Sequence, residues 1–475
     1  MDQPNLEKSN IPTAFIIFGA TGDLAQKKIW PSLFALYRRG MLPEKIRFIG
    51  NSRSKKSNKE FRKFLKELLE DEDPKNKYLD NFLKNVFFQS GDLKEKEVYK
   101  EIKAFLNNFE EEIGMCYNSL FYLSIPPVIY EQVFNNLKES GLSEPCSKET
   151  GWARILVEKP FGEDLKMAEK IDGLLSNLFK EKQVFRIDHY LSKEVMQNIL
   201  MFRFSNALFS PVWNGENIEK IEIIMKEDFG VRGRGSFYDS TGAIRDVGQN
   251  HILQMLAAAT MEYPGSLKPE DLREARAQLF KDINPIPEKE IQERVVLGQY
   301  EGYSDLPNVE EDSNTETYFN IKAFIDNSRW RNTPVYLKSG KSLDETCSEI
   351  NLYLKETPCL CPPEMHEPHQ NVITFRIKPE EELEVIFWAK KPGFELELER
   401  TSLSFSYQES REDHQLIPAY QKALFYATKG DQTLFVSSEE VIEMWKFVNS
   451  ILKNKKKLKL QTYERGSKGP KNNNF

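Results

Sequence analysis

The 475-residue chain has few cysteines and histidines, five of each, and no long apolar run. An odd number of cysteines at irregular spacing does not indicate a disulfide framework, so all five are predicted to be reduced thiols. No apolar segment is long enough for a membrane span, and the polar residues 1–7 lack the basic and apolar regions of a signal peptide. The sequence therefore predicts a cytoplasmic protein that does not contact a membrane.

Basic residues are not in excess either. The formal net charge is -7 at pH 7, from 66 Lys and Arg against 73 Asp and Glu. This balance argues against nucleic acid as the main partner, and an anion-binding site must be built locally from placed cationic side chains. The length is sufficient for two or three domains, each with its own core.

The chain opens with an α/β unit. Residues 14–18 form a short apolar run, and Ile29, Leu33 and Leu36 recur at helical spacing after a glycine-containing turn. The turn has the spacing G-x-x-G-x-x-A, which allows close approach to a pyrophosphate but also fits a plain tight turn. The residues predicted to bind a dinucleotide here are Gly19, Ala20, Thr21, Gly22, Asp23 and Leu24.

A second strand is expected at residues 46–50, and a basic segment follows it. An acidic residue at this point would bind the ribose hydroxyl of NAD. Arg53, with Lys55 or Lys56, suits instead the additional phosphate of NADP. The sequence therefore predicts NADP as the cofactor.

Two further apolar strands, residues 120–125 and 154–157, each run into a proline-containing segment. The alternation of strands and helices predicts an open parallel sheet, with ligands beyond the carboxyl ends of the strands. Both proline-containing ends are therefore expected to line the cofactor crevice. Lys159 would lie there between cofactor and substrate, although a lysine after a strand is commonly only a solvated terminus.

The segment 186–194, R-I-D-H-Y-L-S-K-E, carries four potential substrate contacts. If it is helical, His189 and Lys193 share one face with Tyr190 beside them, an arrangement suited to a phosphate monoester. Asp188 would then be free to orient a partner from another part of the chain. The alternative is an ordinary solvated helix start with mixed charges.

From about residue 186 onward, strict alternation of strands and helices is lost. The β-like runs are 220–225, 317–325, 335–337, 371–377 and 384–388. They predict a second domain on a largely antiparallel sheet. Residues 252–259 are apolar enough for a buried helix, and His251 at its start is either a hydrogen-bonded structural histidine or a functional base.

Several of these segments resemble the glucose-6-phosphate dehydrogenase family. Residues 186–194 are similar to the family signature R-I-D-H-Y-L-G-K-E, with Ser192 in place of glycine. Residues 158–162 match E-K-P-F-G, which related sugar oxidoreductases share in part, and residues 245–251 match R-D-V-x-Q-N-H. The tail 463–470 resembles Y-x-x-G-S-x-G-P, so the resemblance covers nearly the whole chain.

The resemblance implies NADP-dependent oxidation of glucose 6-phosphate to 6-phosphoglucono-1,5-lactone, the first step of the oxidative pentose phosphate pathway. His251 would be the general base, and Asp188 would fix its tautomer. The implied substrate contacts are Lys159, His189, Tyr190, Lys193, Glu227, Asp246 and Lys341. The implied NADP contacts are the turn residues 19–24 with Arg53 and Lys159.

The expected fold is a Rossmann-like, doubly wound parallel sheet in residues 1–187 and an α+β domain on a large, mainly antiparallel sheet in residues 188–475. Because the family commonly dimerises through that sheet, a homodimer or homotetramer is expected. Three positions depart from the family pattern. Asp228 replaces a proline, Thr346 a basic residue and Lys378 a frequent glutamine. Our hypothesis is that Lys378 partly compensates for Thr346.

Two other functions remain open. A sugar dehydrogenase with the same E-K-P element could act on an unphosphorylated sugar. An inactive NADP-binding regulator would be expected to have lost Asp188 or His251, and both are present.

Residues 359–369 raise the question of a metal. Cys359, Cys361, His366 and His369 are chemically sufficient for zinc. Their spacing matches no common zinc motif and the dehydrogenation requires no metal, so an ordinary loop is the default interpretation and no metal is predicted.

Overall fold

The computed structural model describes residues 12–70, 77–145, 151–231, 233–356, 369–395, 397–408 and 416–471. The chain divides into two compact units. Unit 1 comprises Met1–Gly162, Lys166–Ser192 and Ile417–Ser438, and unit 2 comprises Glu163–Leu165, Lys193–Leu416 and Glu439–Phe475. The single predicted boundary after residue 187 thus differs from this division, which assigns residues 417–438 to unit 1.

Unit 1 is built on a seven-stranded sheet in the order β15-β6-β5-β4-β1-β2-β3. Neighbouring strands are parallel except β15, which pairs antiparallel with β6. Each apolar run predicted as a strand before residue 160 overlaps one of these strands. The seven strands of the sheet are β1 (Thr13–Phe18), β2 (Ile46–Ser52), β3 (Val86–Ser90), β4 (Asn118–Leu123), β5 (Ala153–Val157), β6 (Val184–Ile187) and β15 (Phe435–Val436).

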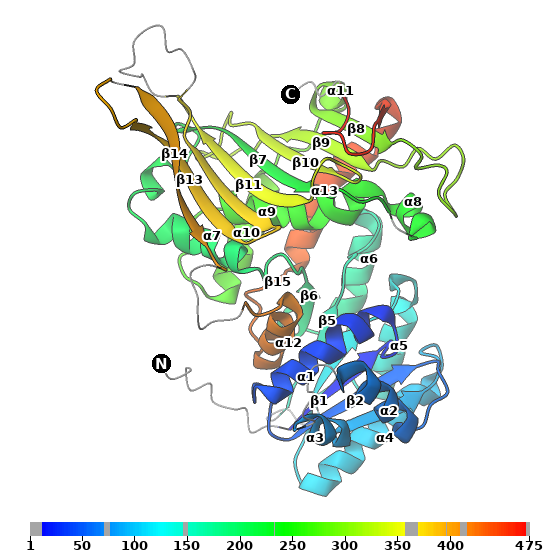
Figure 1. Cartoon of the computed structure of the whole chain (residues 1–475). Coiled ribbons are helices and arrows are strands. Elements are labelled where there is room, and N and C mark those ends of the chain that lie inside the picture. Colours follow the sequence, from blue (N-terminus) through cyan, green and yellow to red (C-terminus); the bar gives the residue numbers. More distant parts are fainter. Residues whose placement is uncertain are drawn as a thin grey trace. The chain divides into compact units, whose positions relative to one another are not determined.

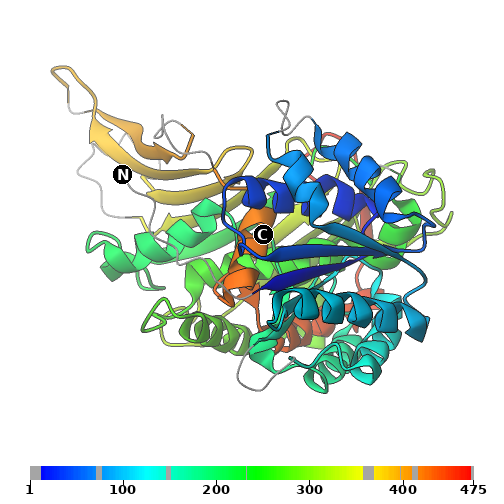
Figure 2. The ribbon, with the colours of Figure 1, turned by 90° about the horizontal axis from the view of Figure 1, so that it is seen from below.

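Helices cover both faces of this sheet (Figure 1 and Figure 2). Phe15 and Ile17 of β1 belong to one buried cluster with α1, α2, α3 and α12. Phe18 points to the other face because side chains alternate along a strand, and there its ring packs against Tyr99 of α4 at 5.9 Å. The helices are α1 (Trp30–Arg38), α2 (Asn58–Leu69), α3 (Leu79–Lys84), α4 (Lys96–Ile113), α5 (Tyr130–Ser140), α6 (Leu165–Ser176) and α12 (Ala419–Lys429).

Unit 2 contains a nine-stranded sheet in the order β14-β13-β12-β11-β7-β10-β9-β8-β16. Its neighbouring strands are antiparallel except the pairs β7–β10 and β8–β16. The predicted large and mainly antiparallel sheet is therefore confirmed, with β14 at one edge (Figure 1). The strands are β7 (Ile218–Lys226), β8 (Val295–Tyr300), β9 (Tyr318–Ala323), β10 (Val335–Gly340), β11 (Cys347–Leu354), β12 (Val372–Lys378), β13 (Glu382–Lys390), β14 (Leu398–Ser406) and β16 (Leu460–Tyr463).

The helices of unit 2 include the predicted buried helix as α9, in which every residue is buried. Its last carbonyl groups, in residues 258–261, accept hydrogen bonds of 2.6–2.8 Å from Arg203, Trp213 and Trp330. A buried helix end requires such partners. The helices are α7 (Glu194–Ser205), α8 (Gly235–Ala243), α9 (Leu253–Thr260), α10 (Pro269–Asp282), α11 (Ile291–Arg294) and α13 (Ser438–Leu452).

The cysteines differ from the prediction at one position. Cys347 is a free, buried thiol, and burial raises its pKa to about 11. Cys116 is disulfide-bonded, so the prediction of five reduced thiols is wrong for this residue. Spacing along the chain does not reveal which thiols a fold brings together.

Among the residues that the structure describes, no helix combines the length and the apolar character that a membrane crossing requires.

Candidate active site

The glycine turn after β1 is shaped for close backbone approach. Gly19 has φ +81°, and a Cβ at this position would lie 2.1 Å from the carbonyl oxygen of Ser124, so only glycine fits. Trp30 Nε1 donates to Ala20 O at 2.9 Å, and Gln26 Nε2 donates to Thr21 O at 2.8 Å. The helical run that leads into α1 therefore holds the turn through two side chains.

Asn51 supports the turn from β2, although sequence reasoning did not select it. Its carbonyl oxygen accepts the N–H groups of Gly19 and Ala20 at 3.0 and 2.9 Å. Its buried side chain donates to Gln89 O at 3.0 Å, which ties β2 to β3. An asparagine at the end of an apolar strand was the only signal of this role.

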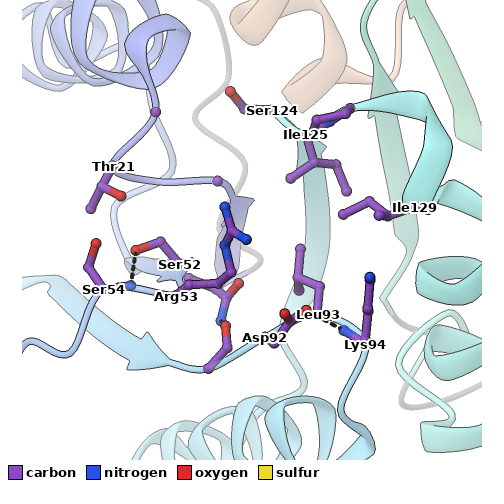
Figure 3. Close-up of a pocket in the computed structure, with 15 residues that line it drawn as sticks. Thr21, Ser52, Arg53, Ser54, Asp92, Leu93, Lys94, Ser124, Ile125 and Ile129 are labelled. Atoms are coloured by element: carbon purple, nitrogen blue, oxygen red, sulfur yellow. Dashed lines mark hydrogen bonds between the residues drawn. The ribbon is translucent and has the colours of Figure 1, made fainter.

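The turn opens into a pocket of about 560 Å³. Figure 3 shows Arg53, Thr21, Ser52 and Ser54 on one side of it and Leu93, Ile125 and Ile129 on the other. The pocket thus has a polar side with an exposed guanidinium, and an opposite side on which apolar side chains adjoin Asp92 and Lys94. The lining residues are Gly19, Thr21, Gly22, Asn51, Ser52, Arg53, Ser54, Gly91, Asp92, Leu93, Lys94, Ser124, Ile125, Pro126 and Ile129.

The pocket agrees with the sequence prediction at Gly19, Thr21, Gly22 and Arg53. Residues 91–94, a loop without a recognisable sequence motif, also line the pocket. Of the two proline-containing strand ends predicted to line the crevice, the one after β4 does so through Pro126. Lys159, after β5, is not among the lining residues.

The segment 186–194 is not a helix, so the predicted common helical face of His189 and Lys193 is wrong. Strand β6 ends at Ile187, turns follow, and α7 begins only at Glu194. Asp188 Oδ1 accepts the N–H of Tyr190 at 2.9 Å. Such a bond from an aspartate to the backbone two residues on stabilises a turn in competition with a helix.

His189 instead belongs to a partly buried cluster in unit 1. Its Nε2 lies 3.3 Å from Glu158 Oε2, and its ring is stacked on that of Tyr420 with a centroid distance of 3.9 Å. Tyr122 donates to the other oxygen of Glu158. Sequence reasoning missed Glu158 and Tyr420, and no local signal could have joined Tyr420 to a residue 231 positions earlier.

Unit 2 brings three predicted substrate contacts together. Lys341 follows β10, and its Nζ forms an ion pair with Glu227 and lies 3.9 Å from Asp246 Oδ2. The lysine side chain is only 6% exposed, whereas the two carboxylates keep 27% and 18% exposure. The site therefore presents carboxylate oxygens that can accept hydrogen bonds from hydroxyl groups.

Two tyrosines contact Lys341 and restrict its position. Tyr463 of β16 donates to Lys341 O at 2.6 Å, and the ring of Tyr238 lies 5.1 Å from Lys341 Nζ. Burial, followed by the nearby charges of Asp246 and other acidic groups, raises the pKa of Tyr238 well above its ordinary value. The phenol of Tyr238 is consequently neutral. Its ring face attracts the ammonium group of Lys341 through a cation–π contact.

His251 lies in a π-helical segment, Ile244–Ile252, that leads directly into α9. It is 7% exposed, and its backbone N–H donates to Asn250 Oδ1 at 2.6 Å. π-Helical turns are rare and frequent at functional sites. Because Asp188 belongs to unit 1 and His251 to unit 2, their pairing stays a prediction.

Lys193 is the first residue of its segment of unit 2, and its Nζ lies 3.2 Å from Glu381 Oε1. The other oxygen of Glu381 accepts the N–H of Val195 at 3.0 Å. The buried carboxylate thus fixes both the ammonium group and the first turn of α7, where a negative charge is favoured.

Two of the departures from the family pattern contact each other. Thr346 Oγ1 donates to Asp228 Oδ1 at 2.5 Å and accepts the N–H of Asp228 at 3.0 Å. Lys378 is exposed and pairs across β11 and β12 with Ser348, two residues after Thr346. The hypothesis that Lys378 compensates for Thr346 stays a prediction.

The predicted cysteine and histidine loop lies mostly outside the described residues, which exclude Cys359, Cys361 and His366. His369 is described, and its ring contacts that of Trp388 at 4.4 Å. Within the described part of the chain no cluster of three or more metal-ligating side chains occurs.

Comparison with known proteins covers almost the entire chain. Residues 16–198 match the family described as glucose-6-phosphate dehydrogenase, NAD binding domain, and residues 200–474 match the corresponding C-terminal domain. "Glucose-6-phosphate 1-dehydrogenase 5, cytoplasmic" of Arabidopsis thaliana is 38% identical over 96% of this chain and 89% of its own. The glucose-6-phosphate 1-dehydrogenase of Borreliella burgdorferi is 37% identical, with 96% and 95% covered.

Solved structures give the same relationship. A glucose-6-phosphate dehydrogenase in complex with its substrate glucose-6-phosphate has a TM-score of 0.89 and 35% identity, and 98% of this chain and 96% of that chain are covered. The glucose-6-phosphate 1-dehydrogenase from Mycobacterium avium has a TM-score of 0.83 and 31% identity, with 97% and 96% covered. These similarities extend over both units.

Proposed function

Because the chain belongs to the glucose-6-phosphate dehydrogenase family, we propose how its own residues carry out the family reaction. The protein is an NADP-dependent oxidoreductase that oxidises glucose 6-phosphate, the first step of the oxidative pentose phosphate pathway. The reaction removes a hydride from C1 of the sugar and a proton from its hydroxyl group.

The pocket of unit 1 fits a dinucleotide. Gly19 has φ +81° and no side chain, so the backbone of the turn can come close to a pyrophosphate. The N–H groups at the start of the following helix favour an anion. Residues 19–24 would hold the pyrophosphate, Arg53 the 2′-phosphate and Lys159 the region between cofactor and substrate. Bound NADP supplies the hydride acceptor.

For the sugar, we assign hydroxyl recognition to Glu227, Asp246 and Lys341. The contacts of Lys341 with both carboxylates support this assignment, because they pre-organise the three groups before substrate binds. His189, Tyr190 and Lys193 would bind the phosphate. The phosphate does not take part in the reaction, but its binding energy would position C1 for hydride transfer.

His251 is proposed as the general base that accepts the proton of the C1 hydroxyl group. Imidazole is suited to this near neutral pH, and Asp188 would stabilise the imidazolium that forms. The single observation that favours His251 is its buried place in a π-helical turn at the start of the fully buried helix α9. Burial in this segment restricts the orientation of the His251 side chain.

Turnover with glucose and glucose 6-phosphate, each with NAD and NADP, tests this function. We expect formation of reduced nicotinamide with glucose 6-phosphate and NADP. Comparable kcat/KM for glucose would favour the alternative that the chain acts on an unphosphorylated sugar. NADP binding without turnover of either sugar would favour an inactive regulator.

Arg53→Ala is expected to raise the KM for NADP by about 10- to 100-fold, because it removes charge-assisted hydrogen bonds worth about 1.5–3 kcal/mol. The KM for NAD should not change, since NAD has no 2′-phosphate. Lys55→Ala provides the control, because Lys55 is exposed but does not line the pocket. Steady-state kinetics with both cofactors measure the effect, and a wild-type kcat/KM more than about tenfold higher for NAD would contradict the assignment.

We also propose a homodimer formed through the large sheet of unit 2, or a homotetramer built from such dimers, in the cytoplasm. The Arabidopsis relatives whose names include "cytoplasmic" support the location. The edge strand β14 supports the assembly, because Leu403 and Phe405 are 66% and 42% exposed on it. Side chains of this kind on a sheet edge favour a partner surface.

Leu403→Glu is therefore expected to convert the dimer into monomers, since it places a charge in the proposed apolar contact. Leu267→Glu changes another exposed leucine, 58% exposed, in a loop of the same unit and should leave the assembly intact. Sedimentation velocity on both variants separates these outcomes. A wild-type protein that is monomeric at micromolar concentration would refute the assembly but not the activity.

A further inference from the structure

Three neighbouring strands of unit 1 end in one partly buried cluster. Tyr122 lies in β4, Glu158 directly follows β5 and His189 lies two residues after β6, and these strands are adjacent in the sheet. Tyr420 of α12 adds its ring, which lies nearly parallel to the imidazole with an interplanar angle of 29°. The cluster therefore joins His189 to three side chains that come from other parts of the fold.

Glu158 is held so that one of its oxygens is left for His189. Tyr122 donates to Oε1, and burial, followed by the charge of Glu158, raises the pKa of Tyr122 well above its ordinary value. The phenol is therefore a protonated donor. His189 Nε2, 3.3 Å from Oε2, then donates its hydrogen to the second oxygen.

Two further phenols near Glu158 are also neutral. Tyr130 packs from α5 and Tyr420 from α12, and burial followed by the charge of Glu158 raises the pKa of both. Neither can ionise near neutral pH. Glu158 is thus the group in this cluster whose charge acts on the imidazole.

The second ring nitrogen of His189 has no hydrogen-bond partner among the described residues, although it is buried. In a neutral imidazole with hydrogen on Nε2, Nδ1 is an acceptor and repels the oxygens of a phosphate. In the imidazolium both nitrogens donate, Nε2 to Glu158 and Nδ1 to a phosphate oxygen. Only the protonated ring can thus satisfy both neighbours.

We propose that Glu158 and Tyr420 are positioning residues that hold His189 for phosphate binding as a doubly protonated imidazolium. Glu158 fixes the ring through Nε2, and Tyr420 fixes its plane and favours a cation on its ring face. Since Glu158 immediately precedes Lys159, the same carboxylate also ties the phosphate end of the substrate site to the strand that carries Lys159. The inference rests on the proposed function, in which His189 contacts the phosphate of glucose 6-phosphate.

The test is the pH dependence of the KM for glucose 6-phosphate. Because only the protonated fraction binds, the wild-type KM should rise about tenfold per pH unit on the alkaline side. Glu158→Gln keeps an acceptor for Nε2–H but removes the charge that favours the cation. The variant should therefore have a KM about tenfold above that of the wild type at a fixed alkaline pH, while kcat changes little.

Glu110→Gln is the matched control. Glu110 is a carboxylate of the same unit that accepts the N–H of Tyr117 at 2.9 Å, outside the cluster. Its substitution should leave the pH profile of KM as in the wild type. If the wild type oxidises glucose 6-phosphate but Glu158→Gln has the wild-type profile, the positioning role is refuted and the proposed function stands; no oxidation by the wild type would refute both.

Tyr420 provides a second test that does not depend on the folding of the Glu158 variant. Tyr420→Phe keeps the stacked ring and should retain the wild-type KM, whereas Tyr420→Leu should raise it about 3- to 10-fold through loss of the cation–π contact. The Tm of each variant separates this effect from lost stability. Equal KM values in all three proteins would refute the role of Tyr420.

Discussion

His251→Asn is expected to lower kcat by about 10²- to 10⁴-fold, the usual contribution of a positioned general base. The KM for glucose 6-phosphate and for NADP should change little, because the phosphate and the cofactor are assigned to other residues. Asparagine preserves polarity in a position that is only 7% exposed, which limits the loss of stability. Steady-state kinetics and equilibrium binding of NADP measure the two parts of this expectation.

His369→Asn is the control for this substitution. His369 is a described histidine of unit 2 that contacts Trp388 and has no assigned role in the reaction. It should keep the wild-type kcat. Asp188→Asn should resemble His251→Asn, since an amide would favour the wrong tautomer of the imidazole. A His251→Asn variant with more than about a tenth of the wild-type kcat would exclude this residue as the base.

Glu440→Ala is expected to destabilise the protein by about 3–5 kcal/mol, the cost of removing one partner from a buried ion pair. Glu440 Oε2 lies 2.9 Å from Arg276 Nε, and the two side chains are 0% and 4% exposed. Gln254 of α9 donates to the same oxygen at 3.0 Å. The substitution would therefore leave a buried guanidinium without its carboxylate and release a contact of the helix that follows His251.

The adjacent residue offers a matched control. Glu439 forms an ion pair with Lys281 at 2.5 Å, but the two side chains are 53% and 43% exposed. Glu439→Ala should have little effect because solvent screens exposed pairs. Urea unfolding followed by tryptophan fluorescence compares the variants. Equal unfolding midpoints for Glu440→Ala and the wild type would contradict the importance of the buried pair.

The fold was largely predictable because hydrophobic periodicity is local. The runs at residues 14–18 and 220–225 fall within β1 and β7, and the apolar helix after His251 is α9. The prediction of a helix at residues 186–194 was wrong for a reason that is also local. Its mixed polar residues allowed a helix, but Asp188 bonds to its own turn, a competition that composition does not reveal.

The candidate site was predictable where a residue belongs to a compact motif, as for Gly19 and Arg53 in the pocket. It was not predictable where long-range packing selects the residue. Tyr420 reaches His189 only because α12 returns to unit 1, and Asn51 is selected by its backbone contact with the glycine turn. Such contacts depend on topology, which one sequence without its fold does not specify.

The return of α12 has a consequence for the order in which the protein can fold. Ala423, Leu424 and Ala427 of α12, with Phe435 of β15, belong to the same buried cluster as the first strand of the chain. After residues 1–192 have left the ribosome, translation must still continue to about residue 438 before this core is complete. At about 5–20 residues per second that interval lasts roughly 10 to 50 s. During it, the nascent cofactor-binding sheet exposes apolar surface and an unpaired edge at β6, which makes it a natural client for chaperones.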